Sequence, residues 1–313
     1  MIAAAREAVL KAERKGLVDN SFGDVLTGFS GKKFIGALQG LVRACATEET
    51  CYLEVGVFQG LTLLATASAN PGIQCFGIDN FAFFDPRSEN LGLVEKRREA
   101  LKANNAHIIN MGFEDAFLDL FSHTGGKKVS VYLVDGPHDY RSQLMCILLA
   151  KKYLADGAVI VIDDSNYPHV RQANADFLRS NPEFKLLFEG YTHCHPKNMT
   201  DSQQTEARDG WWNGINILVH DPGNELESAY PPAPEDSVMF NQDHTIHSER
   251  LAPLAPEIIA LAGALGRPGR LVSQTRRLIA ASREKRPAQG IYDHMNTFSD
   301  GLTKSNHPLM ISR

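Results

Sequence analysis

The sequence lacks a surplus of positive charge, paired cysteines and long apolar runs. Its 313 residues include 32 Lys and Arg against 37 Asp and Glu, a formal net charge of −5. Because phosphate binding needs an excess of basic side chains, this balance disfavours nucleic acid as a partner. Five cysteines without a CxxC pair predict buried thiols in a reducing cytoplasm. No apolar window reaches about 18 residues and the N-terminus is charged, so no membrane span or signal peptide is expected.

Motifs of several enzyme classes are also missing. There is no GxxxxGK[ST] phosphate loop and no GxSxG nucleophile turn. The GxGxxG dinucleotide fingerprint is absent as well, which weakens the alternative of an NAD-dependent oxidoreductase. A chain with 43% hydrophobic and 22% charged residues is nevertheless a normal folded protein.

Short apolar runs alternate with helical patterns in the middle of the chain. The runs lie at 51–57, 75–79, 107–111, 129–135 and 158–164. Helices are expected at 60–69, 91–104, 114–121, 140–154 and 167–180. This alternation predicts an α/β protein whose parallel sheet carries helices on both faces. Two later runs, 184–191 and 215–221, have no expected helix between them and are predicted to pair antiparallel.

The chain divides into three predicted segments. Residues 1–50 form an N-terminal helical segment, residues 51–221 the core, and residues 222–313 a helical extension. The extension begins with a proline-rich stretch and is expected to hold helices at about 255–265 and 270–284. We interpret it as a lid or an oligomer contact, and we expect a homo-oligomer.

The loop after the first run predicts a cofactor site at the carboxyl end of the sheet. Glu54 precedes Gly56 and Gly60, which allow a tight turn and close approach of a ligand. A carboxylate at Glu54 would repel a pyrophosphate but attract an ammonium or a sulfonium. Asp79 ends the second run and suits the two hydroxyls of a ribose. These features favour a nucleoside with a cationic tail, and S-adenosylmethionine (SAM) fits better than NAD or ATP.

The pattern ExGxxxGxT, the acidic end of the second run and GFED at 112–115 resemble class I SAM-dependent methyltransferases over roughly 50–221. The resemblance implies their Rossmann-like fold, a doubly wound, mostly parallel seven-stranded sheet with an antiparallel last strand. It also implies contacts of the first loop with the methionine part, of Thr62 with its carboxylate, of Asp79 with the ribose, and of the GFED acids with adenine. The implied cofactor-binding residues are Glu54, Gly56, Phe58, Gly60, Thr62, Asp79, Glu114 and Asp115.

A second group of acids follows the fourth and fifth runs. Because adjacent parallel strands end side by side, Asp135, Asp163 and Asp164 are expected to converge. Clustered carboxylates repel one another unless they are neutralised, and Mg²⁺ or Mn²⁺ prefers oxygen ligands of this kind. Such a cation would activate an acceptor hydroxyl, and His138, three residues after Asp135, is the candidate base.

This DxxH and DD arrangement is similar to that of the metal-dependent macrocin O-methyltransferase type, which acts on sugars of antibiotics. The resemblance implies a metal held by Asp135, Asp163 and Asp164, with His138 as base. It predicts an O-methyltransferase for a hydroxyl of a small molecule, such as a sugar or another secondary metabolite. Two alternatives stay open: a metal-independent N- or C-methyltransferase, and a non-catalytic SAM-binding subunit.

Overall fold

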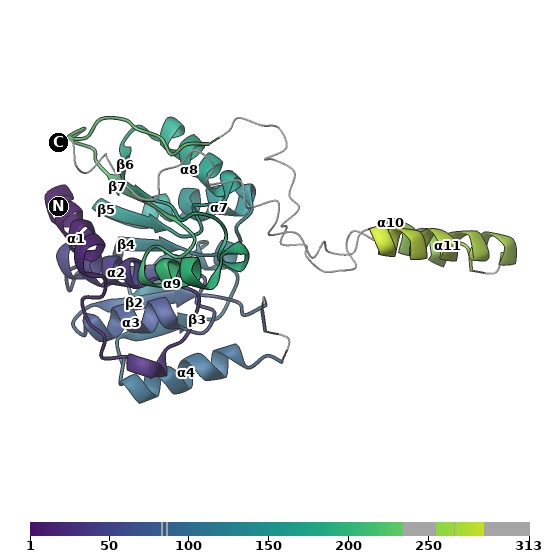
Figure 1. Cartoon of the computed structure of the whole chain (residues 1–313), viewed down its shortest axis with the longest axis horizontal. Coiled ribbons are helices and arrows are strands. Elements are labelled where there is room, and N and C mark those ends of the chain that lie inside the picture. Colours follow the sequence, from purple (N-terminus) through teal and green to yellow (C-terminus); the bar gives the residue numbers. More distant parts are fainter. Residues whose placement is uncertain (83, 86, 234–254, 266, 285–313) are drawn as a thin grey trace.

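The predicted alternation of strands and helices builds one sheet with helices on both faces (Figure 1). The structure, a computed structural model, describes residues 1–82, 84–85, 87–233, 255–265 and 267–284. The strand order in the sheet is β3-β2-β1-β4-β5-β7-β6. The strands are β1 (Thr50–Val55), β2 (Gln74–Ile78), β3 (Ala106–Ile109), β4 (Lys128–Val134), β5 (Leu154–Ile162), β6 (Phe184–Gly190) and β7 (Ile215–His220).

The first five strands run parallel, while β7 lies antiparallel to both β5 and β6. The order reverses direction at β1, from which one half of the sheet extends through β2 and β3 and the other through β4 and β5. The predicted doubly wound sheet and its antiparallel closing pair are therefore confirmed. In such sheets ligands bind beyond the carboxyl ends of the strands, next to this reversal.

Alternate side chains of the central strands enter two separate cores. In β4, Val131 and Leu133 belong to one core, whereas Tyr132 and Val134 belong to the other. The first core is closed by α1 (Ile2–Lys15), α2 (Lys32–Cys45), α3 (Leu61–Ala69) and α4 (Asn90–Leu101). The second is closed by α7 (Tyr140–Ala150) and α8 (Pro168–Ser180). Strands buried on both faces explain the nearly unbroken apolar runs in the sequence.

One prediction about the end of the sheet is wrong. A helix, α9 (Asp201–Asp209), lies between β6 and β7, where none was expected. Its sequence has no apolar stripe, so hydrophobic periodicity does not reveal it. The helix begins at a capping box, in which the Thr200 side chain accepts from the Gln203 amide and the Gln203 side chain accepts from the Thr200 amide.

The expected helix at 114–121 is two short helices, α5 (Phe113–Ala116) and α6 (Leu120–Thr124). A tertiary contact explains the break. The Tyr153 hydroxyl donates toward the Phe117 carbonyl at 3.0 Å and accepts from the Leu120 amide at 3.1 Å. Tyr153 thereby satisfies backbone groups that a continuous helix would pair internally. The helix expected at 140–154 also ends early, at Ala150, and β5 begins at Leu154.

The C-terminal extension contains the two expected helices, α10 (Ala255–Ala262) and α11 (Pro268–Glu284), which contact each other. Figure 1 draws this pair apart from the sheet and its helices. Within the described part of the chain, no helix is both long and apolar enough to cross a membrane. All five cysteines are free and buried, as predicted, and burial raises the pKa of Cys45 to about 11.

Two glycines of α2 offer a paired test of helix packing. A Cβ at Gly36 would lie 2.1 Å from the Gly16 carbonyl oxygen, whereas at Gly40 the nearest atom would be the Ala8 Cβ at 3.4 Å. We expect Gly36→Ala to lower the free energy of unfolding by about 2 kcal/mol because backbone must move. Gly40→Ala should raise it by up to about 1 kcal/mol through helix propensity. Urea denaturation of both variants checks the pair, and equal effects would contradict it.

Candidate active site

The residues that follow four parallel strands lie at one level on the carboxyl edge of the sheet. In each case the backbone amide of the residue after one strand donates to the carbonyl of the last residue of the neighbouring strand. The amide of Gly56 donates to the end of β2 at 2.9 Å, and the amide of Asp79 donates to the end of β3 at 3.2 Å. The amide of Asp135 donates to the end of β1 at 2.9 Å, and the amide of Asp163 donates to the end of β4 at 3.0 Å. These bonds extend the parallel pairing by one residue, and they bring the predicted cofactor loop beside the predicted acidic cluster.

Only glycine fits at position 56. Its φ of +95° is a conformation that other residues rarely adopt, and a Cβ there would lie 1.7 Å from the Asp135 carbonyl oxygen. Gly60, with φ +83°, occupies the N-cap of α3. The turn between these two glycines therefore touches the backbone of the acidic cluster directly.

Glu54 is fully buried under this turn. One carboxylate oxygen accepts from the Tyr52 hydroxyl at 2.7 Å and the other from the Thr62 hydroxyl at 3.2 Å. Burial raises the pKa of Glu54 to about 8, although the two hydroxyl donors act in the opposite direction. Glu54 and Thr62 are thus hydrogen-bonded to each other. A contact of either residue with a cofactor stays a prediction.

The Asp79 carboxylate connects two loops through hydrogen bonds to their backbone amides. Its Oδ2 accepts from the amides of Val57 and Phe58 at 2.9 and 2.8 Å, and its Oδ1 accepts from the Phe81 amide at 2.7 Å. The carboxylate thereby ties the turn after β1 to the loop after β2. A contact of Asp79 with ribose stays a prediction.

The two acids expected near adenine lie on α5 and are exposed. Glu114 forms an ion pair with Arg141 at 3.3 Å, in which both side chains are about half exposed to solvent. The structure does not bring Glu114 or Asp115 into the buried part of the site. Their role in binding adenine stays a prediction.

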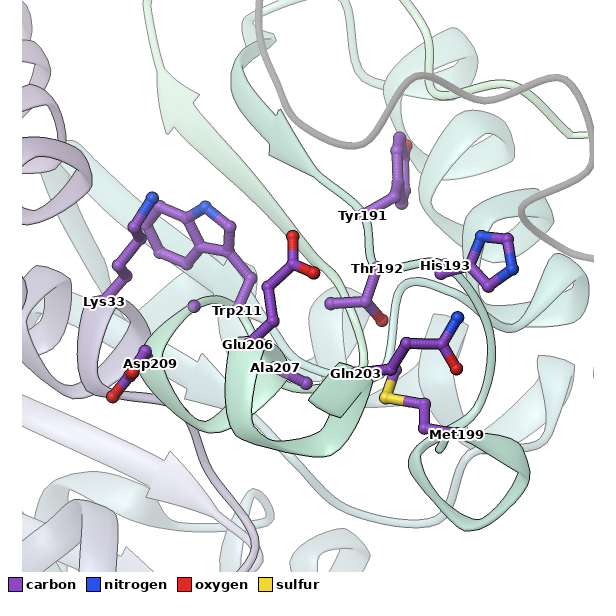
Figure 2. A pocket seen from close by; sticks show the side chains of 11 residues that line it. Lys33, Tyr191, Thr192, His193, Met199, Gln203, Glu206, Ala207, Asp209 and Trp211 are labelled. Atoms are coloured by element: carbon purple, nitrogen blue, oxygen red, sulfur yellow. The ribbon is translucent and has the colours of Figure 1, made fainter. Parts of the chain in front are cut away.

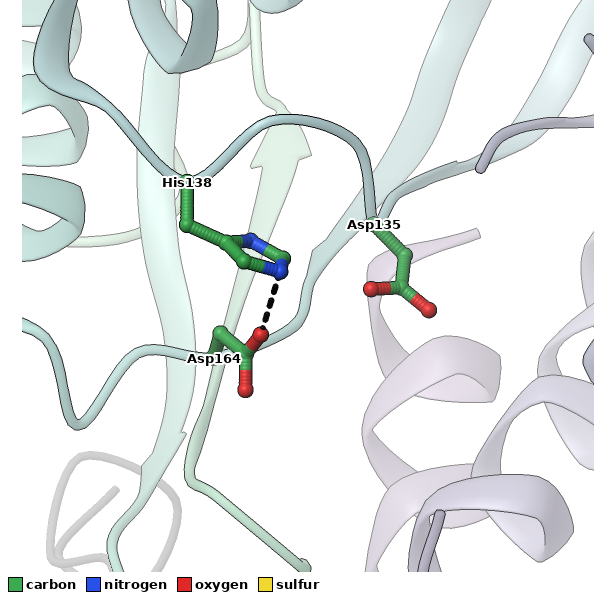
Figure 3. Close-up of side chains that lie close together, drawn as sticks. All are labelled: Asp135, His138 and Asp164. Atoms are coloured by element: carbon green, nitrogen blue, oxygen red, sulfur yellow. Dashed lines mark ion pairs between the residues drawn. The ribbon is translucent and has the colours of Figure 1, made fainter. Parts of the chain in front are cut away.

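Asp135, His138 and Asp164 converge at the ends of β4 and β5 (Figure 3). Each offers one ligand atom, and these atoms all lie within 4.8 Å of one another. His138 Nε2 lies 2.7 Å from Asp164 Oδ2. His138 precedes α7, whose N-cap is Asp139, so a loop rather than a helical turn carries the imidazole toward Asp164.

Asp163 is more enclosed than Asp135 and Asp164, with 4% of its surface exposed. Its Oδ1 accepts from the Asp164 amide at 2.7 Å, which supports the left-handed backbone of Asp164, φ +53°. This turn directs Asp164 toward His138. The sequence predicts a metal held by Asp135, Asp163 and Asp164. The group that converges in the structure contains Asp135 and Asp164 together with His138.

The charges in the cluster perturb one another. Burial raises the pKa of Asp135 well above its usual range, and the negative charges of Asp163 and Asp164 add to that effect. Burial alone would lower the pKa of His138, but the charge and hydrogen bond of Asp164 outweigh it and raise the pKa. Burial would raise the pKa of Asp164, but His138 and Asn213 lower it overall. The site therefore favours a positive charge among its carboxylates.

One residue of this site was not predicted. Asn213, in the loop before β7, donates from Nδ2 to Asp164 Oδ1 at 2.6 Å. With His138 on the other oxygen, Asp164 is held from two sides. Asn213 follows Trp211 and Trp212 in the sequence, but no spacing rule connects it to an acid 49 residues earlier. Only the antiparallel pairing of β5 with β7 brings them together.

A separate pocket of about 380 Å³ lies beside α9 (Figure 2). Its lining includes Lys33, Tyr191, His193, Glu206 and Trp211, and none of the three convergent residues of Figure 3 contributes to it. His193 and Trp211 therefore face this pocket and lie outside the convergent carboxylate group.

The donor set fits a hard divalent cation. The carboxylates of Asp135 and Asp164 suit Mg²⁺ or Mn²⁺ and leave coordination positions for water and substrate, whereas the imidazole of His138 is a less typical ligand of these ions. Burial and the neighbouring carboxylates raise the pKa of Asp135, and a bound cation would favour its ionised form. Asp163 supports this group through the hydrogen bond that its Oδ1 accepts from the Asp164 amide.

One family model and several solved structures are similar to parts of this chain. Residues 53–165 match the family described as a methyltransferase domain. No curated protein matches the chain. Similar solved structures include an O-methyltransferase from Bacillus cereus in complex with SAH, with 13% identity, coverage of 71% of this chain and 100% of that one, and a TM-score of 0.48. Another is the O-methyltransferase TomG from Streptomyces achromogenes in complex with SAM, with 16% identity, coverage of 69% and 89%, and a TM-score of 0.44.

The family match covers β1 to β5 and includes both the glycine turn and the acidic cluster. Together with the strand order, it confirms the Rossmann-like fold expected from the sequence. It also supports the expected class of enzyme, a methyltransferase.

Proposed function

We propose that this protein is a SAM-dependent and divalent-metal-dependent O-methyltransferase that acts on a hydroxyl of a small molecule, such as a sugar or another secondary metabolite. The observation that carries this proposal is the convergence of Asp135, His138 and Asp164 within 4.8 Å, directly beside the glycine turn. The turn would hold the methyl donor, and the convergent group would receive the acceptor.

The cofactor part of the proposal rests on Glu54 and Asp79. Glu54 places a carboxyl group beneath the turn, where ionisation becomes favourable when an ammonium or sulfonium approaches. Asp79 fixes the turn through the Val57 and Phe58 amides, which would keep the loop in a conformation ready for the nucleoside. This preorganisation reduces the entropy lost on binding.

Asp135 and Asp164 would hold the metal, with Asp163 beside them as the sequence suggests. When bound, a divalent cation lowers the pKa of an acceptor hydroxyl and orients it toward the methyl group. Asp135 also lies next to Gly56, so one residue touches both the cofactor turn and the acceptor side of the site.

His138 would remove the proton from the acceptor hydroxyl. If Nε2–H donates to Asp164 Oδ2, Nδ1 of the same ring is the atom that accepts the proton. When bound, SAM would supply the methyl group: its carbon–sulfur bond would break as the carbon–oxygen bond to the acceptor forms, and S-adenosylhomocysteine would be the leaving group. The imidazolium that forms is stabilised by the Asp164 carboxylate, whose orientation Asn213 maintains.

The His138–Asp164 hydrogen bond also favours a second candidate, transfer without a metal to a nitrogen or carbon acceptor. An imidazole paired with a carboxylate is a base and orienting group by itself. Activity that persists in a chelator would select this candidate. Loss of activity in the chelator and recovery with Mg²⁺ would select the metal-dependent reaction.

Replacing His138 by alanine tests the proposed base. We expect kcat to fall about a hundredfold because general-base catalysis is lost, with the Kd for S-adenosylhomocysteine unchanged. Calorimetric titration with S-adenosylhomocysteine, and separately with Mg²⁺, checks both parts. His123→Ala, on α6, is a matched control that should behave as the wild type.

The same titration separates two roles of His138. If the imidazole is a metal ligand, Mg²⁺ affinity falls together with turnover in His138→Ala. If it is the base, Mg²⁺ affinity stays while turnover falls. Failure of the wild-type protein to bind either SAM or S-adenosylhomocysteine would contradict the whole proposal.

A further inference from the structure

Four aromatic side chains form a continuous strip at the edge of the candidate active site. The Phe29 and Phe58 rings are stacked at 5.7 Å, and Phe29 and Trp212 are stacked at 6.3 Å. Phe84 meets Phe58 edge to face at 6.4 Å. The four residues come from four separate loops, and we call them the aromatic strip. Aromatic rings that only stabilise the fold are usually buried, whereas Phe29 is 65% exposed and Phe84 is 80% exposed.

The strip is held in a strained backbone. Phe58, Phe84 and Trp212 have φ values of +49°, +55° and +55°, in the left-handed region that bulky residues rarely occupy. Each such residue costs about 1 kcal/mol or more, and strain of this kind persists where the surrounding contacts impose it and concentrates at ligand-binding sites. Strained aromatic residues at the rim of a site indicate a surface built for a ligand, and here that surface consists of Phe29, Phe58 and Phe84, because Trp212 is only 8% exposed and packs in a small buried cluster.

Two members of the strip are linked to carboxylates of the site. Asp79 accepts from the Phe58 amide at 2.8 Å, which fixes the backbone of Phe58 beside the cofactor turn. At one end of the strip, Trp212 precedes Asn213, whose side chain donates to Asp164 at 2.6 Å. The strip thus runs from the cofactor side of the site to its reaction side.

The loop that carries Phe29 is anchored as well. Arg97, on α4, donates to the Thr27 hydroxyl at 2.7 Å and to the Gln59 carbonyl at 2.7 Å. On its other side, the Lys33 amide donates to the Gly210 carbonyl at 3.2 Å, next to the loop that holds Trp212. Phe29 is therefore fixed between the cofactor turn and the Trp212 loop, although its ring faces solvent.

We propose that the aromatic strip binds a flat apolar ring system of the methyl acceptor. This inference rests on the proposed function and narrows its substrate: the methylated hydroxyl lies on such a ring or on a sugar attached to one. Phe29 and Phe84 present apolar ring surface to solvent, and a flat apolar ring would cover more of it than a polar acceptor would. Flat rings bind these faces because stacking buries apolar area with favourable quadrupole contacts.

The test compares flat and non-flat probes on protein saturated with S-adenosylhomocysteine. Phenyl glucoside is paired with methyl glucoside, and catechol with cyclohexane-1,2-diol, and each Kd is measured by ligand-observed NMR. We expect the flat member of at least one pair to bind about fivefold or more tightly than its partner. Preference within the glucoside pair assigns the hydroxyl to an attached sugar, and preference within the catechol pair assigns it to the ring itself.

Phe29→Ala should reduce that preference to below about twofold without changing the Kd for S-adenosylhomocysteine. Leu118→Ala, which removes an equally exposed apolar side chain at 77% exposure, should leave the preference intact. Equal binding within both pairs, no binding of any probe, or an unchanged preference in Phe29→Ala would overturn the inference.

Two further outcomes would assign the strip to another ligand and would also overturn the inference. A loss of S-adenosylhomocysteine affinity in Phe29→Ala would assign it to the cofactor. A change of oligomeric state in sedimentation, with the probe preference unchanged, would assign it to a subunit contact. Failure of the proposed function is distinct, because the wild-type protein would then not bind S-adenosylhomocysteine at all.

Discussion

Replacement of Asp135 by asparagine is expected to lower kcat about a thousandfold, the upper range for removal of one electrostatic group from an active site. The substitution preserves the shape of the side chain and the hydrogen bond that the backbone amide of residue 135 donates to β1, but it removes a carboxylate from the convergent group. Mg²⁺ affinity should fall with kcat, whereas the Kd for S-adenosylhomocysteine should stay within about twofold. Calorimetry and a methyl-transfer assay measure these quantities.

Asp135→Asn should also stabilise the metal-free protein. Burial and the neighbouring negative charges raise the pKa of Asp135, so its ionisation at neutral pH opposes folding, and asparagine removes that opposition. A higher thermal midpoint together with lost activity would exclude misfolding as the cause. Asp156→Asn is the control, because that side chain on β5 is fully exposed. Full activity of Asp135→Asn would remove the carboxylate cluster from the mechanism.

Replacement of Glu54 by glutamine is expected to abolish a pH dependence of stability. The pKa of Glu54 is about 8 in the folded protein against 4.5 in the unfolded chain, because burial disfavours its charge. The folded state therefore retains a proton that the unfolded state releases between these values, and wild-type stability falls as the pH rises from 4.5 to 8. At about 1.4 kcal/mol per pKa unit, the loss amounts to about 5 kcal/mol.

Glutamine cannot ionise, so Glu54→Gln should be more stable than the wild type at pH 8.5 and similar to it at pH 5. Urea denaturation of the ligand-free proteins at several pH values measures the difference. Glu183→Gln is a matched control: the hydrogen bond from Lys151 lowers the pKa of Glu183, so its contribution is complete above pH 4.5 and the slope stays unchanged. An unaltered slope in Glu54→Gln would show that Glu54 is ionised throughout.

The affinity for SAM should depend on pH through Glu54, in the direction opposite to that of stability. A cationic ligand stabilises the ionised carboxylate, so wild-type affinity for SAM should rise as the pH increases toward 8. In Glu54→Gln this rise should disappear, and affinity at pH 8 should fall by about tenfold or more. The variant would thus be more stable and bind more weakly, a combination that a simple packing defect does not produce.

The fold was predictable because its signals are local. Apolar runs such as 129–135 and 158–164 are long enough to be buried on both faces, and the helices between them require parallel connections. The missed helix α9 depends on a capping box, and the break between α5 and α6 depends on Tyr153, 33 residues after Leu120. Neither feature is visible in the spacing of apolar residues, which is the signal from which the helices were predicted.

The sequence by itself determined which acids end the strands, since parallel strands aligned by their apolar runs must bring Asp79, Asp135 and Asp163 to one edge. Only the tertiary structure decided which partners these groups have. Asp79 accepts hydrogen bonds from backbone amides, and Asp164 lies against His138 and Asn213. It also decided that Phe29 and Trp212, 183 positions apart, stack in one strip. The physical reason is that strand and helix periods act over a few residues, whereas side-chain partners follow from loop conformation and from the antiparallel return of β7.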